Sequence, residues 1–332
     1  MRFNVLALSA LLLFLPSFAG AQALDGSTGD LGDAFTISVT PQYPTPYSQA
    51  TLSFLSTSLD LANATMTVSV GGKRTYAGSV QPVNVALGRA GSVANVTVTV
   101  TSAGAVYSKN VTIQAQDVSL VAEPMSSSHA LYQGKPLVPV EGGTRIVTVA
   151  NIRDAGGKIV SPDSLSYTWT VDGTLIANSS GIGKGTIIVA SPLKYRGRTV
   201  SVDVKSQDGA LVGGAEISLS VTEPTVRVYV NDPLLGIRFD HALTDTYAIR
   251  GAEASLYAVP FSMPLVGGAP TVQWFLNGTA AQTGNTLTLR PAGTGEGRAS
   301  LSLTATTNTA AVASTNLSLS FGAKPSSNFF GL

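Results

Sequence analysis

The chain has 332 residues, of which 12% are charged, and it has a formal net charge of +1 and no cysteine. Without cysteine it has no disulfide, no thiol catalysis and no zinc-ribbon or iron–sulfur site. The scattered, balanced charges leave no electrostatic footprint for nucleic acid or for an anionic membrane surface.

The first residues predict export. Arg2 gives a positive start, residues 5–15 form an apolar run, and small residues follow from Ala19 to Ala23. This is the pattern of a secretory signal peptide, and the run is shorter than the ~20 residues that span a bilayer. An uncleaved anchor is the alternative. We expect cleavage after a signal peptide at residues 1–21, a flexible lead-in at 22–33, and a secreted or cell-surface protein with no membrane span.

From Phe35 onward the dominant pattern has a period of two. Polar and apolar residues alternate over residues 36–40, 65–70, 95–101 and 110–114. Successive side chains on a strand point to opposite faces, so this alternation gives each strand one dry face and one wet face. No long window has helical spacing, and the pattern predicts an all-β fold.

The predicted strands also recur as a set. Opening strands at 37–41, 120–124 and 228–233 are each followed by a second strand, at 50–55, 144–150 and 254–259. Short strands repeating about every 100 residues match the size of an immunoglobulin-type sandwich. We therefore predict tandem immunoglobulin-like β-sandwich domains at 34–117, 118–223 and 224–321, with a tail at 322–332.

Two segments match each other best, residues 167–174 and 272–279. Each places a tryptophan two residues before a Val-Asp-Gly or Leu-Asn-Gly turn, and this pattern resembles bacterial immunoglobulin-like and PKD-like extracellular domains. The resemblance implies core tryptophans on the third strand and a hairpin into the next strand, at Trp169, Trp274, Asp172, Gly173, Asn277 and Gly278. Asp-Gly and Asn-Gly are favoured two-residue hairpin turns. The first unit lacks the tryptophan and resembles the family weakly.

No catalytic site or cofactor is predicted. The two histidines, His129 and His241, lack the spacing of zinc ligands, and no serine has a nucleophile-elbow context. A Ser-His-Asp triad assembled across the fold stays open as an alternative. We expect both histidines to be solvated loop residues and the protein not to be an enzyme.

We commit to no metal site. Asp203 and Asp208 flank a turn, and Asp25, Asp30 and Asp33 lie close together, so both sets are weak candidates for calcium. Neither set has the spacing of a known calcium loop, and surface solvation is the default interpretation.

Aromatic and apolar residues suggest two kinds of contact. A tyrosine platform for a sugar is one interpretation and core-edge packing the other, for Tyr43, Tyr47, Tyr229, Tyr247 and Tyr257. The apolar stretch 231–240, expected to connect the first two strands of the third domain, and the tail are candidate partner contacts. Their apolar residues are Leu234, Leu235, Ile237, Phe239, Phe329, Phe330 and Leu332.

The sequence thus favours a non-enzymatic secreted or cell-surface structural or interaction protein. Its expected partners are other surface or envelope proteins, including pilus components. The alternative is an adhesin that binds a carbohydrate or another ligand, and an extracellular hydrolase ranks third.

Overall fold

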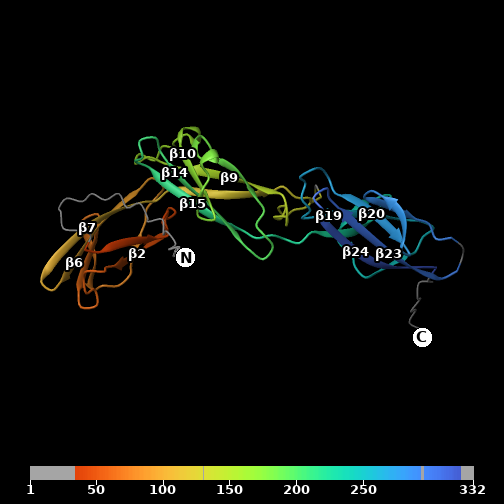
Figure 1. The fold of residues 1–332 in the computed structure, drawn as a ribbon, viewed down its shortest axis with the longest axis horizontal. Coiled ribbons are helices and arrows are strands. Elements are labelled where there is room, and N and C mark those ends of the chain that lie inside the picture. The colour runs from red at the N-terminus through yellow and green to blue at the C-terminus, as the bar shows by residue number, and fades with distance from the viewer. Residues whose placement is uncertain (1–33, 130, 293–294, 323–332) are drawn as a thin grey trace, which may run out of the picture. The chain divides into compact units, whose positions relative to one another are not determined.

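The computed structural model describes residues 34–129, 131–292 and 295–322 (Figure 1). This part of the chain is an all-β protein of tandem sandwiches, and its only helical elements are the 3-10 turns Pro162–Ser164 and Ala177–Ser179. The chain divides into two compact units, residues up to Ala115 and residues from Gln116 onward. In the described ranges no helix is long and apolar enough to cross a membrane.

The first unit is a sandwich of two antiparallel sheets. One sheet has the order β1 (Thr36–Thr40), β2 (Gln49–Leu55), β5 (Val83–Ala86). The other has the order β4 (Lys73–Ser79), β3 (Thr65–Val70), β6 (Val93–Ser102), β7 (Ala105–Gln114). Alternate residues point between the sheets: Val96, Val98 and Val100 of β6 are at most 1% exposed.

The second unit begins with another sandwich. One sheet has the order β13 (Thr186–Ala190), β9 (Gly143–Asn151), β8 (Asp117–Pro124). The facing sheet has the order β11 (Thr174–Leu175), β10 (Ser166–Val171), β14 (Arg198–Lys205), β15 (Val212–Leu219), and β12 (Gly181–Ile182) also pairs with β10.

The last sandwich has two larger sheets. The first has the order β17 (Gly236–Leu243), β16 (Thr225–Asp232), β19 (Ala254–Phe261), β22 (Thr286–Leu289). The second has the order β18 (Thr246–Ile249), β24 (Val312–Phe321), β23 (Gly297–Thr306), β20 (Thr271–Leu276), β21 (Thr279–Thr283). The pairing of β18 with β24 is parallel.

All three sandwiches share one order of seven strands. The first, second and fifth strands form one sheet, and the fourth, third, sixth and seventh form the other. This arrangement is immunoglobulin-like and resembles that of fibronectin type III domains. In the last sandwich, β17 and β18 are inserted between the first and second common strands. The stretch 231–240, expected as a connection, therefore forms most of a hairpin between β16 and β17.

The hairpin after the third common strand has one conformation throughout. Backbone φ is positive at both central residues, Gly71–Gly72, Asp172–Gly173 and Asn277–Gly278, as in a type I′ turn. In the last two sandwiches the turn is also tied to the sixth strand. Oδ1 of Asp172 accepts a hydrogen bond from Thr199 N, and Oδ1 of Asn277 from Ser300 N, at 2.9 Å in both cases.

Equivalent positions of the third strand hold Val68, Trp169 and Trp274, and each is 0% exposed. Each indole nitrogen donates to a backbone oxygen, Lys184 O at 2.8 Å for Trp169 and Gly284 O at 2.7 Å for Trp274. The buried polar atom of each ring is thereby satisfied. The buried side chains form three separate clusters. The domain bounds stay a prediction, because one compact unit holds the last two clusters.

Candidate functional site

Residues 125–129 and 131–137, which follow β8, leave their own sandwich and pair with residues 262–265 just after β19; we call this stretch the junction segment. Ser127 N donates to Met263 O at 2.8 Å, and Ser262 N donates to Ser127 O at 3.0 Å. Leu265 N donates to Met125 O at 3.1 Å. The junction segment therefore extends the β-structure of the last sandwich by a short antiparallel stretch.

Beneath the junction segment lies a cluster of aromatic rings on the outer face of β16, β17 and β19. The ring of His129 stacks on Phe239, with centroids 4.0 Å apart and planes 5° apart. It meets Tyr132, Tyr229 and Phe261 edge-on at 5.9 to 6.5 Å. Because its neighbours Val228 and Val230 point the other way, Tyr229 faces outward, yet it is only 4% exposed. The aromatic cluster therefore covers an outer sheet face of β16, β17 and β19 that would otherwise be exposed to solvent.

The surroundings of His129 favour its neutral form. Nδ1 accepts a hydrogen bond from Leu131 N at 3.0 Å, so this nitrogen carries no proton. Burial among the rings lowers the pKa of His129. His129 lies on a loop as expected, but it is half-buried among rings and not solvated; His241 is exposed as expected, but it lies on strand β17 and not on a loop.

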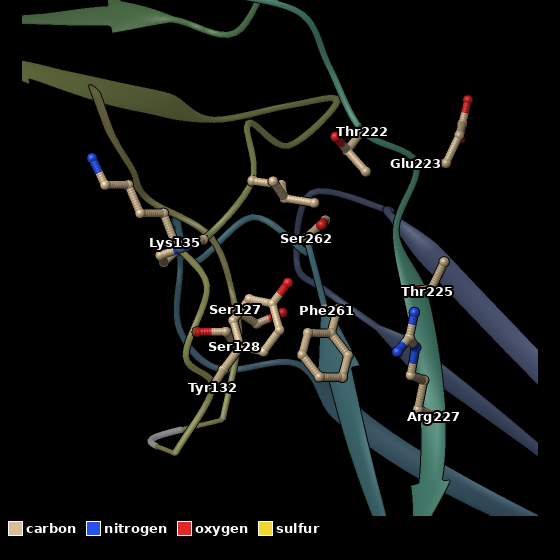
Figure 2. Close-up of a pocket in the computed structure, with 12 residues that line it drawn as sticks. Ser127, Ser128, Tyr132, Lys135, Thr222, Glu223, Thr225, Arg227, Phe261 and Ser262 are labelled. Atoms are coloured by element: carbon tan, nitrogen blue, oxygen red, sulfur yellow. The ribbon is translucent and has the colours of Figure 1, made fainter. Parts of the chain in front are cut away.

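A groove opens between the junction segment, the start of β16 and the end of β19, with a volume of about 170 Å³ (Figure 2). Tyr132, which is 40% exposed, stands at one side. Arg227 stands at the other, with its guanidinium 5.5 Å from the centre of the Phe261 ring. Ser128, Thr225 and Ser262 also line the groove.

The charges of the groove are unequally paired. Glu223, the carboxylate among the lining residues, forms an ion pair with Lys194, with Nζ and Oε1 2.7 Å apart. Arg227 makes no ion pair with any residue of the described ranges. Lys135 also borders the groove, but Figure 2 shows its amino group extending away from Phe261. Arg227, whose guanidinium lies over Phe261, is therefore a cation available to a ligand in this groove.

The wall of the groove contains a strained residue. Ser262, directly after β19, is 4% exposed and has a φ of +56°. Such a φ is uncommon for a residue with a side chain. The backbone hydrogen bond to Ser127 holds this conformation. Within the part of the chain that is described, the Ser262 hydroxyl makes no hydrogen bond.

A second groove of about 420 Å³ lies on the other side of the junction segment. His129, Tyr257, Leu265, Pro270 and Asn285 are among the residues that line it. Tyr229 and Tyr257, two of the five tyrosines considered for a platform, thus belong to the junction, but Tyr229 is covered.

Of the apolar residues considered for partner contact, Leu234 and Leu235 lie at the tip of the β16–β17 hairpin, 92% and 70% exposed. Oδ1 of Asp232 accepts hydrogen bonds from Leu235 N at 2.9 Å and Leu234 N at 2.8 Å. These bonds lower the pKa of Asp232. Phe239 packs into the aromatic cluster, and Ile237 is half-buried. Phe329, Phe330 and Leu332 lie outside the described residues.

The candidates for catalysis and for calcium that lie in the described residues are not gathered into sites. Neither histidine bonds to a serine or aspartate side chain within residues 34–322 where these are described. Asp203 lies on β14 and pairs with Gly214 of β15, and Asp208 caps its own turn by accepting a hydrogen bond from Ala210 N at 3.1 Å. No group of three metal-ligating side chains occurs in the described ranges. Asp25, Asp30 and Asp33 lie outside them.

Sequence reasoning missed the junction segment. One signal was available: the predicted strands 120–124 and 144–150 are separated by a connection much longer than the 2–5 residues usual in a β-hairpin. A connection of that length is commonly functional, and this one carries His129 and Tyr132.

No family model and no curated protein matches the chain. Solved structures match at low similarity. The three N-terminal domains of the bacteriophage RB49 Highly Immunogenic Outer Capsid protein match with 14% identity and a TM-score of 0.24, over 88% of this chain and 100% of that one.

Two further solved structures are similar at the same level. Fibronectin(III)-like modules of Clostridium thermocellum CbhA match with 15% identity and a TM-score of 0.23, over 60% of this chain and 94% of that one. The Bacteroides ovatus mixed-linkage glucan utilization locus protein SGBP-B, solved with a mixed-linkage heptasaccharide, matches with 12% identity and a TM-score of 0.21. The match covers 92% of this chain and 78% of that one. The assignment of the fold rests on the strand order given above.

Proposed function

We propose that this chain is a non-enzymatic structural and interaction protein of the cell exterior, a component of an envelope- or pilus-associated assembly. The observation that carries the proposal is the hairpin tip, where Leu234 and Leu235 are 92% and 70% exposed. Asp232 fixes the turn through two backbone N–H groups. Two leucines held in one conformation bind a partner with little further loss of entropy. The signal-like first residues support the location.

The test is capture of partners by the tagged full chain from cross-linked envelope of its own host. We expect surface or pilus subunits to be recovered, and the double variant Leu234→Ser/Leu235→Ser to lose them. Leu193→Ser is the matched control, because Leu193 is 68% exposed on another sandwich. Equal capture by wild type and double variant would exclude the tip, and deletion of residues 324–332 tests the tail separately.

A second candidate function is binding of a carbohydrate or similar ligand in the groove beside the junction segment. It is favoured by the partly exposed Tyr132, by Arg227, which has no ion pair among the described residues, and by the serine and threonine residues of the groove lining. Rings and hydrogen-bonding groups together are typical of ligand sites. On a glycan array we expect binding by wild type and loss of binding in Tyr132→Ala. A blank array would exclude this function and leave the first proposal standing.

A further inference from the structure

We infer that the groove of Figure 2 binds a carboxylated sugar, with Arg227 as the anchor for its carboxylate. This inference rests on the second proposed function and names its ligand class. The groove, about 170 Å³, is smaller than the roughly 300 Å³ at which drug-sized pockets begin. It therefore admits a single ring, such as one sugar residue of a longer chain that continues into solvent.

The charge of the ligand follows from the pairing of the groove's own charges. Lys194 holds Glu223 at 2.7 Å, and the ion pairs of the described residues leave Arg227 without a carboxylate. Phe261, 5.5 Å away, limits the orientations of the guanidinium. A planar guanidinium presents two parallel N–H groups to a carboxylate, which gives strength and direction together. The complement of this site is an anion with two oxygens.

The remaining lining points to a sugar as the bearer of that carboxylate. Ser262 lines the groove and is only 4% exposed. Its hydroxyl has no hydrogen-bond partner among the described residues. Ser128 and Thr225, which also carry hydroxyls, line the same groove. Sugar hydroxyls both donate and accept, as serine and threonine hydroxyls do. Tyr132, 40% exposed, offers the apolar face of a sugar ring a flat surface.

The experiment compares carboxylated glycans, with uronic or sialic acids, against their methyl esters, which keep the ring and remove the charge. The full chain is screened on an array, and the best glycan is titrated calorimetrically. We expect esterification to weaken binding about 10- to 100-fold, the range for losing a hydrogen bond to a charged group. Arg227→Gln should cause a loss of the same size, and Arg227→Lys a smaller one, because lysine keeps the charge without the fork.

Arg74→Gln is the matched control, since Arg74 is an exposed arginine on β4 in the other compact unit. It should leave affinity unchanged, and thermal unfolding should show that Arg227→Gln is folded. Equal binding of acid and ester, or equal loss in Arg74→Gln, would overturn the anchor while leaving sugar binding intact. Binding of neither acid nor neutral glycans would overturn the anchor and the second function together.

Discussion

The ring of His129 lies flat on the ring of Phe239, with centroids 4.0 Å apart. The two residues belong to different sandwiches, since His129 is on the segment between β8 and β9 and Phe239 is on β17. The contact therefore links the two sandwiches of the second unit through an uncharged imidazole. It also makes the link sensitive to protonation.

We predict that stability of the second unit falls as pH falls from 7 toward 5. Burial lowers the folded-state pKa of His129, so below about 6.5 the unfolded chain takes up a proton that the native chain does not. The stability that neutral His129 contributes is fully present above the pKa of the unfolded chain. It is lost as pH falls toward the lower pKa of the folded chain. Protonation at Nδ1 also removes the bond from Leu131 N, which is 3.0 Å away.

The measurement is the thermal midpoint from pH 8 to pH 5. Burial is the cause of the lowered pKa of His129. The chain has two histidines, which supplies the control. His129→Gln should flatten the profile between pH 7 and 5, and His241→Gln should not. A profile unchanged by His129→Gln would contradict the prediction.

Replacing Trp274 by Phe should destabilise the last sandwich by about 2–4 kcal/mol. The smaller ring leaves a cavity at a position that is 0% exposed, and Gly284 O loses its donor at 2.7 Å. Hydrogen exchange locates the effect: we expect faster exchange in residues 271–306 and unchanged exchange in 166–205. Trp169→Phe should give the reverse pattern. Uniform acceleration in both segments would show that the two cores unfold as one.

The strands and their turns were predictable because their signals are local. In β6 the alternation of threonine and valine sets which side chains enter the core, and Val96, Val98 and Val100 are at most 1% exposed. The Asn277–Gly278 pair specifies a turn with positive φ at both residues. The pairing of β6 with β7 follows from such signals, because the two strands are consecutive and are joined by a tight turn.

The junction was not predictable from local patterns. The bond between Ser127 and Met263 joins residues 136 positions apart. Period two places Tyr229 on the outer face of its sheet, but it does not say that another segment covers that face and leaves 4% of the residue exposed. The β16–β17 hairpin was missed because Pro233 and Gly236 punctuate the apolar stretch like a loop.

The hydrogen bond from Ser300 N to Asn277 Oδ1, 2.9 Å long, yields a graded prediction at the third-strand turn. Asn277→Gly keeps the backbone conformation and loses the side-chain bond, so it should cost about 0.5–1.5 kcal/mol. Asn277→Ala loses the same bond but keeps a β-carbon at a φ of +50°, so it should cost roughly 1–2 kcal/mol more than the glycine variant. In the first sandwich the equivalent turn position is occupied by Gly71, also with a positive φ.

Urea unfolding of the full chain measures both variants. Asn316→Ala serves as the control, because Asn316 is an exposed residue of β24 and is not among the residues with positive φ. It should change stability by less than about 0.5 kcal/mol. Equal stability of the glycine and alanine variants would contradict the role given to the backbone conformation.

Asp232→Ala should loosen the hairpin tip without unfolding the sandwich. Asp232 Oδ1 is 2.8 Å from Leu234 N and 2.9 Å from Leu235 N, and the structure gives these two amides no other partner among the described residues. Without the carboxylate they should exchange with solvent faster, while the core amides of Val228 and Leu256 keep their rates. Amide exchange followed by NMR measures this directly.

Asp240→Ala is the matched control on the same hairpin, because it removes an exposed acid that pairs with Arg238 and not with the tip. It should leave the exchange of Leu234 and Leu235 unchanged. If Asp232→Ala also left it unchanged, the tip would be held by its Pro233 and Gly236 backbone alone. Asp232→Ala leaves both leucines in place. If it accelerates exchange of the Leu234 and Leu235 amides and also weakens partner capture, then binding depends on the fixed conformation of the turn and not only on the presence of the leucines.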